Sequence, residues 1–273
     1  MPSPTAITPS QLSRLIGTPG APVLVEVYLS GPTPGEDLRL IPGSFRVQLD
    51  RLDDLPSEFV DRKVVVVCPD GKALSQGAAA KLRAMCVPAE TLEGGKAAWI
   101  AAGEPTVATG KIPDALNGTR SVWVTRHRPK IDRIACPWLI RRFVDPRAEF
   151  LFVPPADVLS VADQFGAQPF DIEDVFWSHR GPLCTFDVML EEFTLQPVAL
   201  MRVADIVRGA DTNRHDLAPQ AAGLLALSLG LSRMFRDDIE QLESGMLLYD
   251  ALYRWARDAV DEGHDWPSAA VRQ

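Results

Sequence analysis

The sequence predicts two domains, an α/β domain followed by an α+β, mostly helical domain. With 273 residues, the chain exceeds one typical domain. Over residues 1–105, short apolar runs alternate with helical segments, the order of a sheet with crossover helices. Residues 104–119 contain two prolines and two glycines and no sustained period, and residues 106–119 form the expected linker. The second domain covers residues 120–268, and from Pro197 onward its pattern is helical.

The composition is that of a soluble globular protein, with 46% hydrophobic and 23% charged residues. No apolar run approaches the roughly 20 residues needed to cross a bilayer. The first residues lack the basic and apolar regions of a secretory signal, so we expect a cytoplasmic protein with no membrane partner. The four cysteines form no C-x-x-C pair, which argues against a disulfide framework and a Cys-rich zinc site.

The elements of the first domain follow from its apolar pattern. Thr8 and Pro9 are typical of an N-cap and a first helical residue, and Gly17 ends that short helix. Continuous apolar runs, typical of buried parallel strands, are expected at residues 22–28 and 63–68. Helices are expected at residues 55–60, 75–85 and 96–102.

Cys68 is the candidate nucleophile of this domain. It ends a central strand, before the loop of residues 69–74 and the start of the next helix, where open α/β sheets carry their chemistry. Loop amides and the positive end of the helix would stabilise a thiolate or a persulfide. Cys86, near the end of an Ala-rich helix, is expected in the core.

Together with I-P-G at 41–43, L-E-G-G at 92–95, A-W at 98–99 and A-G-E-P at 102–105, this pattern resembles a rhodanese homology domain. The resemblance implies that fold and a sulfurtransferase activity. Two of the family's usual anion-binding or network-forming groups are absent, because Glu26-Val27-Tyr28 stands where Asp-x-Arg is common and Ala73-Leu74 stands near the end of the Cys loop. Only Lys72 offsets Asp70. Persulfide transfer at Cys68 and a degenerate, interaction-type module therefore both stay open.

The second domain opens with a strand at residues 121–125 and a basic run. Between Arg120 and Arg142 there are seven Arg or Lys residues and one acid, Asp132, in a chain of net charge −8. Asp132 is the expected N-cap of an amphipathic helix that Pro137 bends. Further strands are expected at residues 150–153 and 170–177, and helices at 198–207, 218–235 and 238–260.

Residues 170–187 place His179 among several acids. If residues 170–176 are extended, Asp171 and Glu173 share a face beside His179, and if Thr185 caps a helix, Asp187 lies in its first turn. Imidazole with carboxylates suits iron, manganese or zinc. The alternative is a surface ion pair. If His179 fails as a ligand, Asp211 and the acids of the last helix are the next candidates.

The basic run suits the recruitment of small anions through Arg126, Arg128 and Arg133, with Lys72 doing the same in the first domain. A nucleic-acid partner is disfavoured, because the pI is near 5.1 and no DNA-binding motif accompanies the arginines. The alternative is that these arginines pair with the acid-rich C-terminal helix.

The run D-R-I-A-C-P-W-L-I-R-R-F at 132–143, followed by D-P, resembles the C-terminal domain of chromate-resistance protein B (ChrB), and similar positions extend to Tyr253. Some members of that family resemble iron- or manganese-dependent superoxide dismutases. The resemblance implies an iron or manganese site, with zinc less favoured, and His179, Asp187 and Glu173 as ligands. It implies a stress protein acting on superoxide or chromate, whereas Cys68 would take thiosulfate. A chromate-responsive regulator without turnover and a homo-oligomer remain alternatives.

Overall fold

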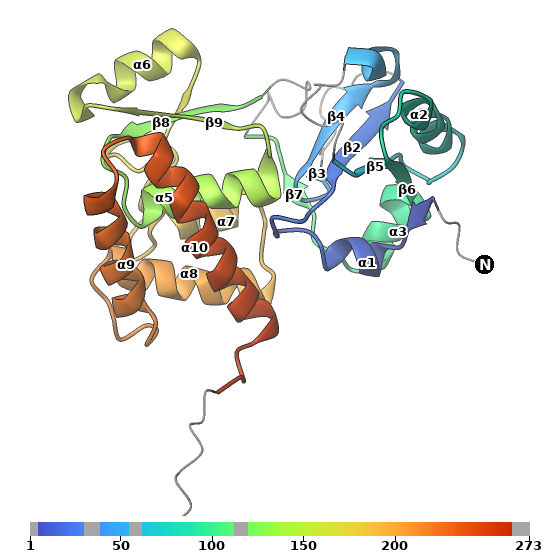
Figure 1. The fold of residues 1–273 in the computed structure, drawn as a ribbon. Coiled ribbons are helices and arrows are strands. Elements are labelled where there is room, and N and C mark those ends of the chain that lie inside the picture. Colours follow the sequence, from blue (N-terminus) through green and yellow to red (C-terminus); the bar gives the residue numbers. More distant parts are fainter. Residues whose placement is uncertain (1–4, 30–38, 55–61, 112–119, 264–273) are drawn as a thin grey trace, which may run out of the picture.

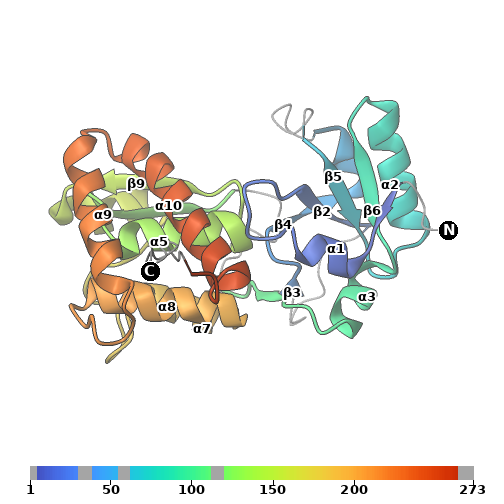
Figure 2. The same ribbon diagram turned by 60° about the horizontal axis from the view of Figure 1, so that its bottom comes forward.

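The computed structural model describes residues 5–29, 39–54, 62–111 and 120–263. Two lobes lie side by side, the N-terminal part of the chain in one and the C-terminal part in the other (Figure 1, Figure 2). The helix expected at residues 55–60 and most of the expected linker lie outside the described residues. The domain boundaries themselves stay a prediction.

The N-terminal lobe contains a five-stranded parallel sheet in the order β1-β6-β5-β2-β4. Its strands are β1 (Ala6–Ile7), β2 (Val23–Tyr28), β4 (Ser44–Gln48), β5 (Val64–Val67) and β6 (Ala89–Leu92). The two continuous apolar runs form the neighbouring central strands β2 and β5, as expected. β1, β4 and β6 were not predicted, because none of them contains an apolar run as long as those of β2 and β5.

Three helices flank this sheet: α1 (Pro9–Ser13), α2 (Ala73–Ala84) and α3 (Gly95–Ala101). The expected start of α1 is confirmed, since the Thr8 side chain accepts from Gln11 N and the Gln11 side chain accepts from Thr8 N. α2 packs on one face of the sheet through Ala78, Ala79 and Leu82. The opposite face belongs to a larger apolar core.

Part of the expected linker is ordered as a strand. β7 (Val107–Ala108) pairs antiparallel with β3 (Arg39–Leu40). Ala108 N also donates to Phe193 O of the C-terminal lobe at 3.0 Å. The described part of the chain between the lobes is therefore hydrogen-bonded to both of them.

The C-terminal lobe contains a three-stranded sheet in the order β10-β8-β9. β8 (Val122–Arg126) and β9 (Glu149–Val153) lie where strands were expected, but the strand expected at residues 170–177 is wrong. β10 is Gln168–Pro169 alone, and the chain then turns, because Asp171 and Asp174 take positive φ angles of 52° and 59°. All three strands are parallel, so this lobe adds crossover helices to the expected α+β pattern.

The crossover helices lie on opposite faces of the small sheet, α5 (Asp132–Leu139) on one and α6 (Val158–Phe165) on the other (Figure 1). The remaining helices are α7 (Thr185–Glu192), α8 (Val198–Asp211), α9 (Ala221–Met234) and α10 (Asp238–Asp258). The last three were predicted with small shifts of their ends. Within the described residues, no helix combines the length and the apolar character needed to span a membrane.

Helix α5, which lies within the basic run, departs from the expectation at both ends. Asp132 is its first residue, and Ile131 holds the N-cap position. Pro137 removes one backbone donor inside α5, and the chain continues as a π-helical turn, η3 (Ile140–Val144). Phe143 O in that turn accepts from Gly43 N of the N-terminal lobe at 2.7 Å.

The two lobes share one apolar core. A single cluster of buried residues runs from Leu24, Val65 and Trp99 in the N-terminal lobe to Phe143 and Tyr253 in the C-terminal lobe. The contact is close, because a Cβ on Gly17 would lie 2.4 Å from Phe143 Cζ. The lobes are thus packed against each other through side chains as well as through the backbone bonds above.

Candidate functional site

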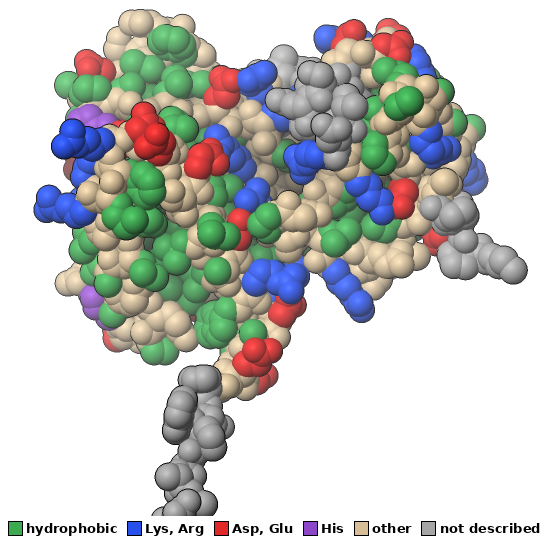
Figure 3. Space-filling view, in the orientation of Figure 1, with side chains coloured by type: hydrophobic (Ala, Val, Ile, Leu, Met, Phe, Trp, Pro, Cys, Tyr) green, Lys and Arg blue, Asp and Glu red, His purple; other side chains and the backbone are tan. Residues whose placement is uncertain are grey.

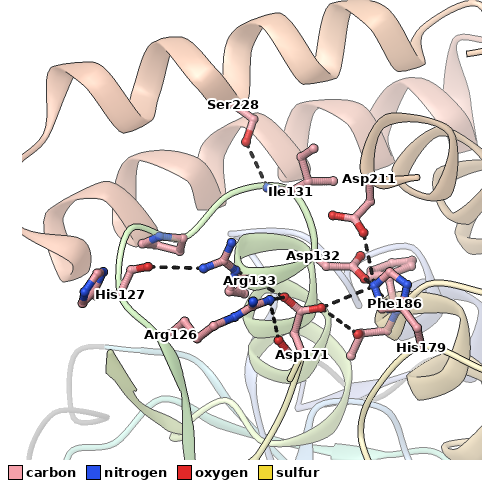
Figure 4. Close-up of polar contacts among 12 residues, drawn as sticks. Arg126, His127, Ile131, Asp132, Arg133, Asp171, His179, Phe186, Asp211 and Ser228 are labelled. Atoms are coloured by element: carbon pink, nitrogen blue, oxygen red, sulfur yellow. Dashed lines mark hydrogen bonds and ion pairs between the residues drawn. The ribbon is translucent and has the colours of Figure 1, made fainter. Parts of the chain in front are cut away.

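Three aspartates converge on one histidine in the C-terminal lobe (Figure 4). His179 Nε2 lies 3.2 Å from Asp211 Oδ2, 3.5 Å from Asp171 Oδ1 and 3.6 Å from Asp132 Oδ2. Single ligand atoms of Asp132, His179 and Asp211 all lie within 4.8 Å of one another. One imidazole nitrogen can donate one hydrogen bond, so three carboxylates around it are more than a simple ion pair requires.

Two helices and one loop contribute the residues of this cluster. Asp132 begins α5, and Asp211 ends α8. Asp171 follows β10, and His179 lies in the loop that leads to α7. Asp211 stands at the negative end of its helix, where a carboxylate is disfavoured unless a positive charge offsets it. Packing of the helices therefore assembles the cluster.

Asp132 is the most buried member, with none of its side chain exposed. Its Oδ2 accepts from Thr185 N at 2.6 Å and from Phe186 N at 3.4 Å, the positive end of α7. Its Oδ1 is buried and has no hydrogen-bond partner among the described residues. A buried acceptor without a partner costs about 1–3 kcal/mol, so this oxygen is short of a donor or a cation.

Backbone strain accompanies the site. Ile131, directly before Asp132, has a φ of 44°, and Asp171 has a φ of 52°. A β-branched residue at positive φ is strained by about 1–3 kcal/mol and persists only when neighbours hold it. Two neighbours do so here: Ser228 Oγ accepts from Ile131 N at 3.0 Å, and Tyr249 Oη donates to Ile131 O at 3.0 Å. α9 and α10 thus hold Asp132 in place.

The electrostatics favour a bound positive charge. Hydrogen bonding to Asp171 and then to Asp211 raises the pKa of His179 to about 10. Burial, followed by repulsion from Asp211 and Asp171, raises the pKa of Asp132 well above its usual range. Burial is the main reason for the raised pKa of Asp132, whereas the neighbouring carboxylates raise the pKa of His179 and add to that of Asp132. A divalent cation would compensate the negative charge of these carboxylates.

The donor set fits a divalent metal ion. Asp132, His179 and Asp211 offer two carboxylates and one imidazole, a combination suited to manganese, iron or zinc. Ligands at right angles around an ion about 2.1 Å away lie about 3 Å apart, close to the separations above. Asp171 stands beside these three, and its Oδ1 accepts from Thr185 Oγ1 at 2.9 Å. The His179 side chain is 40% exposed, so the site opens to solvent.

Two of the three predicted metal ligands lie elsewhere. Asp187 closes a capping box at the start of α7, with Oδ2 accepting from Cys184 N at 3.0 Å and Oδ1 pairing with Arg208 Nη1 at 2.7 Å. Glu173 is exposed, because the chain turns where a strand was expected. The structure therefore brings His179 together with Asp132 and Asp211 instead. Metal binding itself stays a prediction.

The predicted anion-binding arginines have internal partners. Arg126 Nη2 donates to Asp171 O at 2.9 Å, and Arg133 Nε lies 3.2 Å from Asp171 Oδ2, so both border the cluster. Arg128 donates to Phe235 O and Ser232 O at the end of α9. The alternative of pairing with the last helix holds for Arg141 with Glu243 and Arg142 with Asp250.

The basic run is therefore used largely inside the C-terminal lobe. On the face that Figure 3 draws, Lys and Arg side chains are interspersed with acidic ones over both lobes. This distribution offers no support for a nucleic-acid interface on that face.

Cys68 lies where the sequence predicts it, directly after β5 and before α2. Its Sγ is 3.1 Å from Ser75 Oγ and 3.5 Å from Asp70 Oδ1. A Cβ on Gly95 would lie 2.3 Å from Cys68 O, so the start of α3 lies directly against this loop. Cys68 lines a cavity of about 360 Å³ together with Arg39, Arg46 and Lys96.

Two other predictions for this lobe concern Lys72 and Cys86. The Lys72 side chain is 79% exposed, and its Nζ lies 3.9 Å from Asp70 Oδ2. Lys72 is not among the residues lining the Cys68 cavity. The expectation that Cys86 is in the core is wrong: it follows the end of α2 with a φ of 63° and is exposed.

Asp132 and Asp211 are the site residues that the sequence analysis did not assign to the metal. Asp132 was interpreted as an N-cap, and Asp211 was only a fallback. The available signal was indirect: Asp132 is the single acid within the basic run, and Asp211 ends a helix where a carboxylate is unfavourable. Neither signal shows that these two aspartates lie beside His179.

The comparisons with known proteins agree with part of the expected resemblance. Residues 123–256 match the family model described as ChrB, C-terminal domain. Protein ChrB of Cupriavidus metallidurans is 33% identical over 154 residues, which cover 55% of this chain and 46% of that protein. The chain thus spans about half the length of this curated relative.

Among solved structures, a thiosulfate sulfurtransferase from Pseudomonas aeruginosa is 30% identical over 38% of this chain and 19% of that chain, with a TM-score of 0.32. A rhodanese-related protein from Thermoplasma volcanium is 25% identical over 37% of this chain and 96% of that chain, with a TM-score of 0.30. Rhodanese-related structures are therefore similar to part of the chain. The similarity to superoxide dismutases stays a prediction.

Proposed function

We propose that the C-terminal lobe binds a divalent iron or manganese ion through Asp132, His179 and Asp211, and that the protein acts on a small oxidising anion during chromate or oxidative stress. One observation carries the proposal: three carboxylates surround His179 Nε2, and the buried Oδ1 of Asp132 has no partner among the described residues. The likeness of this part of the chain to a ChrB domain supports the stress role.

The charge of the site supports an anionic substrate. In the deprotonated state that a metal requires, with His179 neutral, the three carboxylates and the two bordering guanidinium groups of Arg126 and Arg133 sum to −1. A divalent ion changes that sum to +1, which would attract a small anion to the open side near His179. The chain as a whole carries −8, so the attraction would be local.

Iron or manganese would supply one-electron chemistry, for which superoxide is the first substrate to test. The residues of this chain have simpler tasks. His179 and the two aspartates would hold the ion, and Arg126 and Arg133 orient Asp171 at its edge. Ile131, held by Ser228 and Tyr249, keeps Asp132 aimed into the site.

Metal analysis of the purified full chain tests this proposal. We expect His179→Ala and Asp211→Asn each to lower the affinity for Mn²⁺ or Fe²⁺ by at least about 10–100-fold, the effect of losing even an outer partner. Superoxide dismutation should fall with the metal content. Glu173→Gln is the matched control, since it removes an exposed acid from the same loop and should change neither. Full metal content in His179→Ala would contradict the site.

A second function has its own observation, the cavity beside Cys68. We propose persulfide transfer there. The Cys68 thiolate would attack the outer sulfur of thiosulfate, the S–S bond of thiosulfate would break, and sulfite would leave with the bonding electron pair. The persulfide sulfur would then pass to a thiophilic acceptor such as cyanide, which becomes thiocyanate and regenerates the thiolate.

Replacement of the two cysteines of this lobe tests sulfur transfer. Cys68→Ser should abolish thiosulfate:cyanide turnover, because a hydroxyl cannot carry the sulfur. Cys86→Ser should leave the turnover unchanged, since Cys86 is exposed beyond the end of α2. Equal turnover in both variants would show that the N-terminal lobe is not catalytic.

A further inference from the structure

The Cys68 cavity contains a cation whose position calls for a ligand. Arg46 in β4 is only 8% exposed, and its Nη1 is buried without a hydrogen-bond partner among the described residues. Its guanidinium lies 4.1 Å from the centre of the Tyr28 ring. A cation–π contact contributes about 0.5–2 kcal/mol and leaves the in-plane N–H donors unsatisfied.

The neighbouring carboxylate is already occupied. Glu26 of β2 lies beside Arg46 of β4 in the register of these two strands. Its Oε1 accepts from Ile41 N at 2.8 Å and from Ser44 Oγ at 2.9 Å, and its Oε2 pairs with Lys96 Nζ at 3.0 Å. Among the described residues no carboxylate forms an ion pair with Arg46. A buried guanidinium without an anion is costly, so its presence needs a compensating ligand.

The cavity can receive such a ligand. Its volume is about 360 Å³, and the Arg, Lys, Asp and Glu residues that line it are Arg39, Arg46, Lys96 and Glu26. Cations thus outnumber carboxylates around a space that is large enough for a small anion. The planar fork of an arginine matches two oxygens of a tetrahedral oxyanion, and it does so best where water is excluded.

We propose that Arg46 makes the Cys68 cavity a binding site for a tetrahedral divalent oxyanion, such as a sulfur oxyanion or chromate. Tyr28 orients the guanidinium by stacking, and Lys96 remains paired with Glu26 as part of the wall. The inference concerns the cavity of the proposed sulfur transfer. Its test therefore uses sulfate, which cannot donate sulfur to Cys68, and molybdate, a tetrahedral dianion that stands in for chromate.

Calorimetric titration of the full chain with sulfate and with molybdate, at constant ionic strength in chloride, tests the site. We expect saturable binding of one dianion per chain, at least about tenfold weaker in Arg46→Met and intermediate in Arg46→Lys, which keeps the charge but loses the fork. Arg51→Met is the control, because Arg51 is exposed and lies just after the same strand. Tighter binding of sulfate than of molybdate, or the reverse, identifies the oxyanion preferred.

Thermal unfolding separates binding from a structural role. Because Arg46 is buried with an unsatisfied donor, Arg46→Met should keep or raise the Tm measured without a dianion, and should lose the rise in Tm that sulfate causes in the unchanged protein. A large fall in Tm without a dianion would make Arg46 a structural residue and overturn the proposal. Equal sulfate binding in Arg46→Met, or none in the unchanged protein, would overturn it too. Dianion binding without any turnover would remove only the sulfur-transfer function.

Discussion

His179 illustrates how strongly a few buried charges can change one side chain. Its imidazole is 40% exposed and yet has a pKa raised to about 10, because carboxylates from three elements face the same nitrogen. Arg126 and Arg133 offset only the Asp171 side of the cluster. Without a metal, a proton on His179 is the nearest available positive charge, so proton and metal compete for one position.

This competition predicts a pH dependence. A pKa raised from 6.5 to about 10 stabilises the metal-free protein fully below about pH 6.5, and this stabilisation is lost as the pH rises towards 10. We expect the Tm of the metal-free protein to fall more steeply over this range than that of His179→Gln, and the increase in Tm on adding Mn²⁺ to grow with pH. Parallel Tm profiles for the two proteins would show that His179 does not take up this proton.

At the scale of elements, close packing of α5 against α10 supports the site. A Cβ on Gly245 of α10 would lie 2.6 Å from Ile134 Cγ2 in α5. Ile134 is buried and lies two residues after Asp132 in the same helix, so any shift of α5 also moves Asp132. A small residue at this crossing is therefore needed for the position of the proposed ligand.

Gly245→Ala tests this contact. Alanine stabilises a helix by about 1 kcal/mol relative to glycine, whereas overpacking costs about 1–3 kcal/mol. We expect the cost of the clash to exceed the gain, because Ile134 is branched at Cβ and stiff. Urea unfolding should show a net loss of stability, together with weaker metal binding. Ile134→Ala in the same chain should remove the clash, so that the double variant loses less than the sum of the single losses.

The control for this element is Gly223→Ala or Gly230→Ala in α9, where an added Cβ meets nothing within 4 Å. These changes should leave stability unchanged or raise it by up to about 1 kcal/mol. A gain of stability in Gly245→Ala equal to that of the controls would show that α5 and α10 can separate without cost.

At the scale of the whole molecule, the two lobes form one packed body. The apolar core is continuous between them, and Gly17 reaches Phe143 and Tyr253 so closely that a Cβ would lie 2.4 Å and 2.8 Å from their ring atoms. Gly17 also has a φ of 77°, which an L residue adopts with strain. The lobes should therefore stabilise each other.

Calorimetry of the full chain should accordingly show one cooperative transition. Gly17→Ala should lower its Tm, by strain and overpacking of about 1–3 kcal/mol, without splitting the peak. Gly20→Ala is the control, since its nearest atom, Thr18 Oγ1, is 3.9 Å from an added Cβ. Two separate transitions, of which Gly17→Ala shifts only one, would show that the lobes unfold independently.

The sequence by itself determined the elements whose pattern is local. Apolar runs predicted β2 and β5, helical spacing predicted the three helices that close the chain, and the position of Cys68 after β5 followed from the strand that precedes it. These features depend on the burial of one segment at a time, which side-chain periodicity records directly. The acids near His179 in the sequence also pointed to the loop in which Asp171 and His179 lie close together.

Only the tertiary structure decided which acids face His179. Asp132, Asp171 and Asp211 are far apart in the sequence, and they meet because α5, α8 and the loop after β10 end at one point. Asp187 and Glu173 are closer to His179 in the chain than Asp132 and Asp211 are, but they point elsewhere, one into a helix cap and one into solvent. Periodicity reports which face of a segment is buried, whereas a site of this kind depends on where the ends of several packed segments converge.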